Sequence, residues 1–255
     1  MTASGVGGRQ MDASLRVVNQ HIKGATSVAV LTGAGVSAES GIPTFRDPGG
    51  LWQQYRPEEL ASPDAFRRDP RLVWEWYDWR RQKIAQASPN PAHVALAQLE
   101  RIVPKFLLIT QNIDDLHGTA GSRRLIELHG CIWRVRCQAE GTVHENREVP
   151  LKTLPPRCDC GGLLRPDVVW FGEPLSVEIQ AQAFAAAETS DVFLTVGTSA
   201  IVHPAAALPI VAKDRGAFVA EINPAPTPIT PYLDCYLQGP AGMILPQILS
   251  MLTNS

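Results

Sequence analysis

Two polar segments and one histidine carry residue types that can do chemistry. The first segment, residues 32–50, reads TGAGVSAESGIPTFRDPGG and follows a short apolar run. Its glycines at 33, 35 and 41 let the backbone approach a ligand closely, and the start of a following helix would favour a diphosphate. Tight turns need glycine for steric reasons alone, so Gly-Ala-Gly by itself is a weak indication. Residues 43–46 add an aromatic–cation pair suited to cover a reactive ligand.

The second segment is TQNIDDLH, residues 110–117, and the histidine lies in IELHG, residues 126–130. Asn112 and Asp114 are two residues apart at the end of an apolar run, where their side chains can orient a ribose or a carboxamide. His129 precedes Gly130, a place where its ring can face a cleft. An imidazole with a pKa near 6.5 is a suitable general base at neutral pH, although a lone histidine is more often structural.

These segments must be positioned by the elements around them. Short apolar runs that are typical of buried parallel strands alternate with helical patterns. The expected strands cover 27–35, 105–112, 191–199 and 218–224, and the expected helices cover 11–24, 70–86, 91–103 and 177–190. This alternation predicts an α/β fold, with a Rossmann-like parallel sheet that has helices on both faces. All four runs end in polar residues, so we expect one shared site at the carboxyl ends of the strands.

Two segments interrupt this alternation and predict insertions. Residues 41–88 hold a Gly/Pro-rich loop and an aromatic-rich helix, which we expect to form a cofactor-binding flap and a helical module. Residues 131–172 hold clustered cysteines and several prolines, which predicts a small zinc-ribbon-like module. The Rossmann-like dinucleotide-binding domain then comprises the remaining segments, 11–40, 89–130 and 173–255. Residues 1–10 are expected to be a flexible tail.

Composition and charge exclude several classes of function. The 255 residues carry a formal net charge of -2 and no basic stripe, so we expect no binding of nucleic acid. No apolar run is long enough to span a membrane, and the N-terminus lacks the pattern of a signal peptide. Five cysteines, three of them between positions 137 and 160, indicate a reducing compartment. We therefore expect a cytoplasmic protein that does not bind membranes and is a monomer by default.

Together, the polar strings resemble those of the sirtuin family of NAD-dependent protein lysine deacylases. The matching strings follow family order and are GAGVSAESGIPTFR, TQNIDDLH, ELHG, PDVVWFGE, VGTSA and EINP. The resemblance implies that NAD is a consumed co-substrate and that the partners are proteins or peptides with acylated lysines. The acyl oxygen would attack the ribose carbon that bears nicotinamide. The products would be free lysine, nicotinamide and an O-acyl-ADP-ribose.

The resemblance also implies roles for individual residues. His129 would be the general base, and Asn112 and Asp114 would share the catalytic pocket. The substrate peptide would bind as an added strand along Val168, Val169, Trp170, Phe171, Gly172 and Glu173. Phe45 would guard the nicotinamide side, within a set of NAD-binding residues that comprises Gly33, Ala34, Gly35, Ser37, Ala38, Glu39, Pro43, Thr44, Phe45, Arg46, Trp52, Gln111, Asn112, Ile113, Asp114, Gly197, Thr198, Ser199, Asn223, Pro224, Ala225 and Ala241.

One expected helix bears on the choice of acyl group. Tyr77 and Arg80 are three residues apart and share a helical face. This Y-x-x-R pair resembles the subgroup that removes succinyl, malonyl and glutaryl groups, in which a guanidinium and a phenol bind the distal carboxylate. Ala61 lies where a small residue would widen the acyl pocket. The alternative is that Tyr77 and Arg80 only pack against neighbouring tryptophans. Within the resemblance, we expect a desuccinylase that also deacetylates.

The cysteine cluster departs from the two C-x-x-C pairs of the family. Cys137, Cys158 and Cys160 match three of the four zinc ligands, and Glu140 stands where the fourth is expected. Glu140 or His144 could complete a tetrahedral zinc site, a water could complete a three-thiolate site, or the module could hold no metal.

Other functions are compatible with parts of this sequence. The same NAD site would serve an enzyme that is mainly a deacetylase, or a mono-ADP-ribosyltransferase. The incomplete cysteine pairs and acidic balance argue against a zinc-bearing regulatory protein. The joint presence of Asn112, Asp114 and His129 argues against an inactive NAD sensor.

Overall fold

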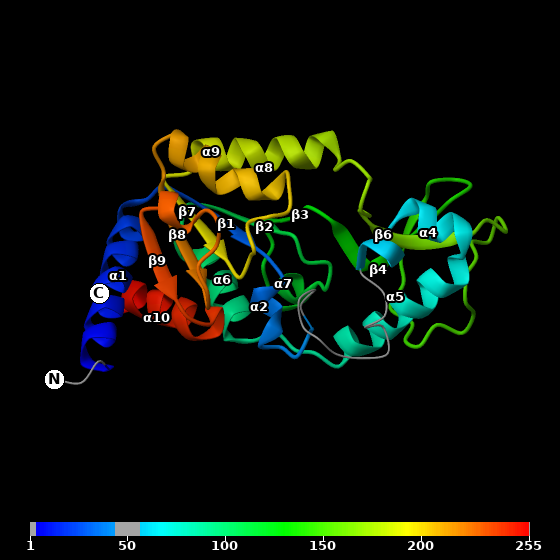
Figure 1. Ribbon diagram of the computed structural model, residues 1–255, viewed down its shortest axis with the longest axis horizontal. Coiled ribbons are helices and arrows are strands. Elements are labelled where there is room, and N and C mark those ends of the chain that lie inside the picture. The colour runs from blue at the N-terminus through cyan, green and yellow to red at the C-terminus, as the bar shows by residue number, and fades with distance from the viewer. Residues whose placement is uncertain (1–3, 44–56, 255) are drawn as a thin grey trace.

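A computed structural model describes residues 4–43 and 57–254. The chain folds around a six-stranded sheet and a separate three-stranded sheet, which lie at opposite ends of an elongated molecule (Figure 1). Four residues expected to contact NAD lie outside the described ranges, namely Thr44, Phe45, Arg46 and Trp52.

The large sheet is parallel throughout and has the strand order β3-β2-β1-β7-β8-β9. Its strands are β1 (Ser27–Thr32), β2 (Lys105–Thr110), β3 (Leu125–Glu127), β7 (Val192–Val196), β8 (Phe218–Asn223) and β9 (Cys235–Gln238). The Rossmann-like fold class is confirmed. The strand order reverses on either side of β1, and ligands of such sheets bind beyond the carboxyl ends of the strands at that point.

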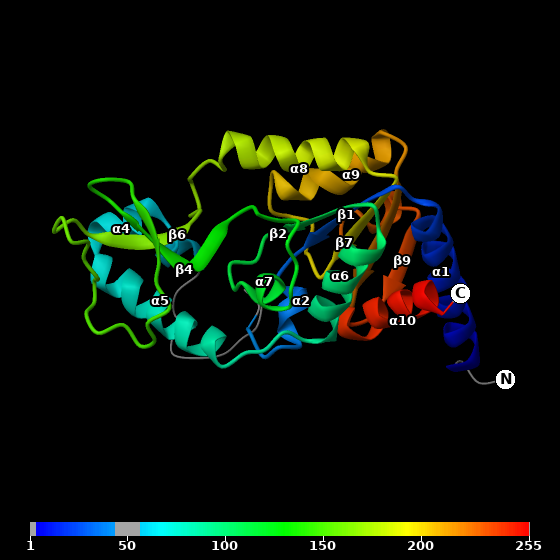
Figure 2. The same cartoon turned by 180° about the vertical axis from the view of Figure 1, so that it is seen from behind.

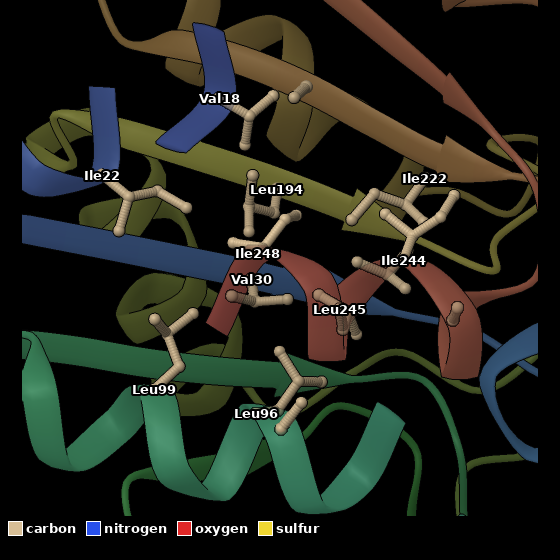
Figure 3. Close-up of a cluster of buried hydrophobic side chains, with 14 of the residues drawn as sticks. Val18, Ile22, Val30, Leu96, Leu99, Leu194, Ile222, Ile244, Leu245 and Ile248 are labelled. Carbon is tan, nitrogen blue, oxygen red and sulfur yellow. The ribbon is translucent and has the colours of Figure 1, made fainter. Parts of the chain in front are cut away.

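Helices cover both faces of this sheet (Figures 1 and 2). On one face lie α8 (Val177–Thr189) and α9 (Leu208–Asp214). On the other lie α1 (Ser4–Gly24), α6 (Pro91–Ile102) and α10 (Ala241–Thr253). Figure 3 shows Val18, Leu96 and Ile248, one from each of these three helices, in one buried cluster with Val30 of β1. This buried cluster fixes the sheet whose strand ends carry the polar loops.

The N-terminal helix corrects one expectation. Because α1 begins at Ser4, residues 4–10 extend a helix instead of forming the flexible tail expected for residues 1–10. Elongating a helix that is already anchored costs little, and residues 11–24 supply that anchor by packing against the sheet. None of the helices in the described part of the chain combines the length and apolarity required to cross a membrane.

The two expected insertions share one hydrophobic core. The first contributes α3 (Pro57–Leu60), α4 (Pro63–Arg68) and α5 (Pro70–Ala85). The second contributes the antiparallel strands β4 (Gly130–Cys137), β5 (Val143–Glu145) and β6 (Leu164–Val168), in the order β5-β4-β6. Aromatic side chains of α5 pack against the strands in a single buried cluster. The helical module and the cysteine module are therefore one packed unit beside the large sheet.

Candidate active site

The loops after β1, β7 and β8 are hydrogen-bonded to one another at the carboxyl edge of the large sheet. The Gly33 N–H donates to Val196 O at 3.1 Å, and the Gly35 N–H donates to Gly197 O at 2.8 Å. The Asn223 side-chain amide donates to Thr198 O at 3.3 Å. Three strand ends expected to contact NAD are thus brought to one place.

The glycines of these loops serve packing between loops. A Cβ on Gly33 would lie 2.9 Å from Gly197 O, and a Cβ on Gly35 would lie 2.7 Å from the same oxygen. Gly197 has a φ of +58°, and a Cβ there would lie 2.5 Å from Val36 N. These glycines were expected to let the backbone approach a ligand closely. In the structure they let two backbone loops approach each other closely. The helix that follows, α2 (Gly35–Ala38), has only one turn, so a helix dipole contributes little to the cradle.

Several expected NAD contacts lie around this cradle. Gln111 donates to the Thr198 hydroxyl at 3.0 Å, which links the ends of β2 and β7. The Glu39 carboxylate accepts from the Gly242 N–H at 2.8 Å, beside Ala241 at the start of α10. The other residues that were expected to contact NAD and that the structure describes are Ala34, Ala38, Pro43, Ile113, Ser199, Pro224 and Ala225.

Asn112 and Asp114 are held together by Ser37. The Ser37 hydroxyl donates to Asp114 Oδ2 at 2.8 Å, and the Asn112 amide lies 3.2 Å from Ser37 Oγ and 3.1 Å from Gly33 O. Burial raises the pKa of Asp114, and the hydrogen bonds from Leu116 N–H and Ser37 O–H oppose that rise. The residues expected in the catalytic pocket therefore form one bonded group below the β1 loop.

Two buried histidines that sequence reasoning did not assign support this group. His93 Nε2 lies 3.4 Å from Ser37 Oγ, and His117 Nε2 lies 2.9 Å from Thr32 Oγ1. Their rings are 4.7 Å apart. Burial lowers the pKa of His93 to about 4 and that of His117 to about 3, so both rings are neutral at pH 7. His117 lies inside TQNIDDLH, whereas nothing in the sequence indicated that α6 would bring His93 to the β1 loop.

Trp133 of β4 is a second residue that sequence reasoning missed. Its indole N–H donates to Asp114 O at 3.0 Å. The guanidinium of Arg147 lies 5.6 Å from the Trp133 ring and pairs with Asp115 at 2.7 Å. Asp115 has a φ of 66°, a left-handed conformation that costs free energy in a non-glycine residue. The smaller unit therefore fixes the Asn112–Asp115 turn from outside the sheet.

His129 lies at the junction between the two units and is half-buried. Its Nδ1 lies 3.0 Å from Gln111 O. With the proton on Nδ1 donated to that carbonyl, Nε2 keeps its lone pair and can accept a proton. Burial lowers the pKa of His129, and the hydrogen bond to Gln111 opposes that shift. The imidazole is therefore neutral at pH 7, the state that a general base requires.

This pKa predicts the acidic limb of the pH profile. Because only neutral imidazole accepts a proton, a lowered pKa extends the active range to more acid pH. We expect kcat/KM for deacylation to stay level between about pH 7 and 8 and to fall only below the ordinary value of 6.5. A pH series with one acylated peptide at saturating NAD measures this. An acidic limb centred above pH 6.5 would show that burial does not lower the pKa of His129.

The segment 169–171 connects residues that are far apart in the sequence. The Val169 N–H donates to His129 O, the Trp170 indole N–H donates to the Tyr77 hydroxyl, and the Phe171 N–H donates to Ala61 O, each at 2.9 Å. One short loop thus contacts His129, Tyr77 and Ala61, which are the expected base, phenol and small pocket residue. Of the expected peptide contacts in the loop, Phe171 and Gly172 are exposed, whereas Val168 and Trp170 are buried.

Glu173, which was expected in the peptide groove, is bonded within the loop. Its carboxylate accepts from Arg165 at 2.6 and 2.8 Å and from the Trp170 N–H at 2.9 Å. A carboxylate with three such donors supports the loop.

Tyr77 of α5 contacts this loop, and Arg80 lies three residues further along the same helix. Burial raises the pKa of Tyr77 to about 12, while the charge of Arg80 opposes that rise. Burial lowers the pKa of Arg80, and the charges of Tyr77 and Asp114 oppose it. The guanidinium also lies 4.9 Å from the centre of the Trp76 ring. The charge of Arg80 therefore acts on both the Tyr77 phenol and the Asp114 carboxylate.

The cysteine module contains a cluster of possible metal ligands. One ligand atom from each of Cys137, Glu140, Cys158 and Cys160 lies within 4.8 Å of the others. The backbone N–H of Gly162 points to the Cys160 sulfur at 3.4 Å. Four such atoms fit a tetrahedral zinc, with Glu140 in place of the missing thiolate. His144, the other expected fourth ligand, is exposed and lies 3.2 Å from the Thr142 hydroxyl.

Comparison with known proteins decides the family. A description of the Sir2 family matches residues 33–204. The chain belongs to the Sir2 family. An "NAD-dependent protein deacylase 2" of Pyrobaculum aerophilum is 56% identical over 221 residues, which cover 86% of this chain and 88% of the relative. The expected resemblance to sirtuins is confirmed at the level of the family.

Solved Sir2 structures agree with the fold. A Sir2 homologue in complex with NAD superposes with a TM-score of 0.90 and 49% identity, covering 94% of each chain. Sir2Af2 bound to a myristoylated histone peptide superposes with a TM-score of 0.79 and 36% identity, covering 95% of this chain and 98% of the other. One of these Sir2 structures contains NAD, and the other contains an acylated peptide.

Proposed function

We propose that this Sir2 protein is an NAD-dependent protein lysine deacylase that prefers succinyl- and malonyl-lysine and also removes acetyl groups. The observation that carries the acyl preference is the position of Arg80 and Tyr77 on α5, within electrostatic range of each other and beside the loop bonded to His129. A guanidinium and a phenol donor together suit a carboxylate. Burial of a carboxylate is costly unless it is paired, so the preference depends on the pairing of the acyl carboxylate with Arg80.

The proposed roles follow from the geometry. NAD, when bound, supplies the ribose carbon that accepts the acyl oxygen. The loops of Gly33, Gly197 and Asn223 would hold the dinucleotide, and Asn112 with Asp114 would orient the nicotinamide end. Nε2 of His129 would take the proton from a ribose hydroxyl, which then attacks the acyl carbon. The peptide would add as a strand along the exposed part of the loop 168–173.

One peptide with different acyl groups tests the preference. We expect kcat/KM for succinyl-lysine to exceed that for acetyl-lysine and for succinamyl-lysine, the neutral isostere of succinyl. The succinamyl group cannot form the ion pair with Arg80. This loss should cost about 1.5–3 kcal/mol and lower kcat/KM roughly tenfold to a hundredfold relative to succinyl. A wild-type enzyme that treats succinyl and succinamyl alike would refute the acidic preference and leave a general deacylase.

We also propose that Cys137, Cys158, Cys160 and Glu140 hold a structural zinc, which would tie β4 to the segment after β5. Purified protein should contain about one zinc per chain. Glu140→Gln should weaken zinc retention by more than about tenfold, since removal of an outer partner alone has that effect, and Glu140→Cys should restore it. Metal analysis after dialysis against a chelator measures both, with His144→Ala as the control. Equal retention in Glu140→Gln and wild type would exclude Glu140.

Finally, we propose a cytoplasmic monomer. None of the five cysteines, all of which the structure describes, forms a disulfide, although the sulfurs of Cys137 and Cys160 are only 3.5 Å apart, as expected in a reducing compartment.

A further inference from the structure

His129 lies in the short link that joins the large sheet to the smaller unit. Strand β3 ends at Glu127 and β4 begins at Gly130, so the link itself has only two residues. Gly130 has a φ of +78°, and a Cβ there would lie 2.2 Å from Asp167 O of β6. The chain therefore enters the smaller unit directly after the proposed base, in close contact with β6.

The side chain of Arg134 spans the same junction. Arg134 belongs to β4 of the smaller unit, and its Nη2 lies 2.7 Å from the carboxylate of Glu127, at the end of β3 in the large sheet. Its Nε donates to Asp167 Oδ2 of β6 at 3.2 Å. One guanidinium thus connects the strand end before His129 to the strand that packs against the residue after it.

An irregularity in β4 places Arg134 at this junction. The pairing of β4 with β6 shifts within residues 131–135. Such bulges redirect side chains from the regular alternation of a strand, and they are frequent next to active sites. In the same bulge, the Ile132 N–H donates to Ile113 O at 2.8 Å, and the Trp133 indole bonds to the same turn. The bulge is therefore the part of the smaller unit that bonds to the polar loops of the large sheet.

The Glu127 carboxylate depends on its pair with Arg134. The Glu127 side chain is only 18% exposed, and in the described part of the chain Arg134 is its one ion-pair partner. A largely buried carboxylate that loses its counter-charge takes up a proton or moves toward water. Because Glu127 is two residues before His129, such a movement displaces the link that carries the imidazole.

We infer that Arg134, through its pairs with Glu127 and Asp167, is a positioning residue that keeps the His129 imidazole in place for proton transfer. The inference rests on the proposed role of His129 as the base. Arg134 acts through the link and touches neither NAD nor the peptide. The base accepts its proton only after nicotinamide has left, so the release of nicotinamide should not depend on Arg134.

The ratio of deacylation to exchange of labelled nicotinamide into NAD tests this role. Both reactions pass through the same first step, so a loss of folded enzyme or of substrate binding lowers them together and leaves their ratio unchanged. Arg134→Met should lower the rate of O-acyl-ADP-ribose formation about tenfold or more, because misplacing a catalytic group by about 1 Å can cost roughly a hundredfold. Exchange should stay near the wild-type rate, so the ratio should fall. Arg134→Lys keeps the charge and should restore part of the ratio.

Arg136→Met is the matched control. Arg136 lies on the same strand and donates to the same Asp167 carboxylate at 2.7 and 3.0 Å, so it shares the acid of β6 without the contact to Glu127 in the described structure. This variant should keep the wild-type ratio.

Glu127→Gln tests the other end of the pair and serves if Arg134→Met does not fold. It should lower the ratio in the same direction, and Arg134→Met should cause little further loss in a Glu127→Gln enzyme. A wild-type ratio in Arg134→Met or in Glu127→Gln, or an equal fall in Arg136→Met, would overturn the inference while deacylation by the wild type stands. A wild type that forms no O-acyl-ADP-ribose would overturn the proposed function itself.

Discussion

Replacing His129 with alanine should abolish deacylation and leave nicotinamide exchange in place. A general base contributes a factor of about 10² to 10⁴, so the turnover should fall by at least that range. The proton leaves a ribose hydroxyl only after nicotinamide has departed. His129→Ala should therefore still exchange labelled nicotinamide into NAD in the presence of an acylated peptide, because that first step does not require Nε2.

The measurement compares product formation and exchange in the same preparation. His144→Ala is the control, since His144 is an exposed histidine whose ring lies near Thr142 and away from Gln111. It should retain both reactions. Persistent deacylation in His129→Ala would remove this residue as the base. Loss of both reactions would show that the ring is needed to build the site.

Changing Arg80 to methionine should reduce desuccinylation far more than deacetylation. Methionine keeps much of the length and packing of the side chain but removes the charge and the planar set of donors. A charge-assisted hydrogen bond contributes about 1.5–3 kcal/mol, which corresponds to roughly a tenfold to a hundredfold loss for the succinyl peptide. The acetyl peptide has no distal carboxylate, so its kcat/KM should change by no more than about threefold.

Two further variants sharpen that comparison. Arg80→Lys keeps the charge without the planar fork and should give an intermediate loss. Arg71→Met makes the same change on the same helix, at a residue that pairs with Glu75 at 2.9 Å on the exposed side. It should leave both activities near wild type. Equal losses with succinyl and acetyl peptides in Arg80→Met would show that Arg80 only supports the fold of α5.

The sheet was predictable because its strands are apolar runs followed by polar loops. The four long strands and their helices are present, whereas β3 and β9 have only three and four residues and gave no periodic signal. The shared core of the two insertions was also not predictable. It depends on contacts between α5 and β4, which are about fifty positions apart in the chain.

In the site, too, contacts between residues far apart in the sequence could not be predicted. Asn112, Asp114 and His129 were found because each follows a strand that ends at the same edge. The supports of Asp114 were missed because Trp133 reaches this turn from β4 and His93 reaches Ser37, the partner of Asp114, from α6, and neither lies in a polar string. Glu173 was expected in the groove, but its pairing with Arg165 depends on a turn whose geometry the string PDVVWFGE does not reveal. The sequence left Glu140 and His144 as alternatives for the fourth zinc ligand, and only the folded cluster distinguishes them.

A competition in one tube tests the central claim most directly. Equal amounts of one peptide bearing succinyl-lysine and acetyl-lysine would compete for limiting NAD, and mass spectrometry would identify every species that carries ADP-ribose. An NAD-dependent deacylase with a carboxylate-binding pocket should yield mainly O-succinyl-ADP-ribose, with a minor amount of O-acetyl-ADP-ribose. A product mixture led by O-acetyl-ADP-ribose would contradict the acyl preference. ADP-ribose attached to protein, without either small product, would contradict the deacylase itself.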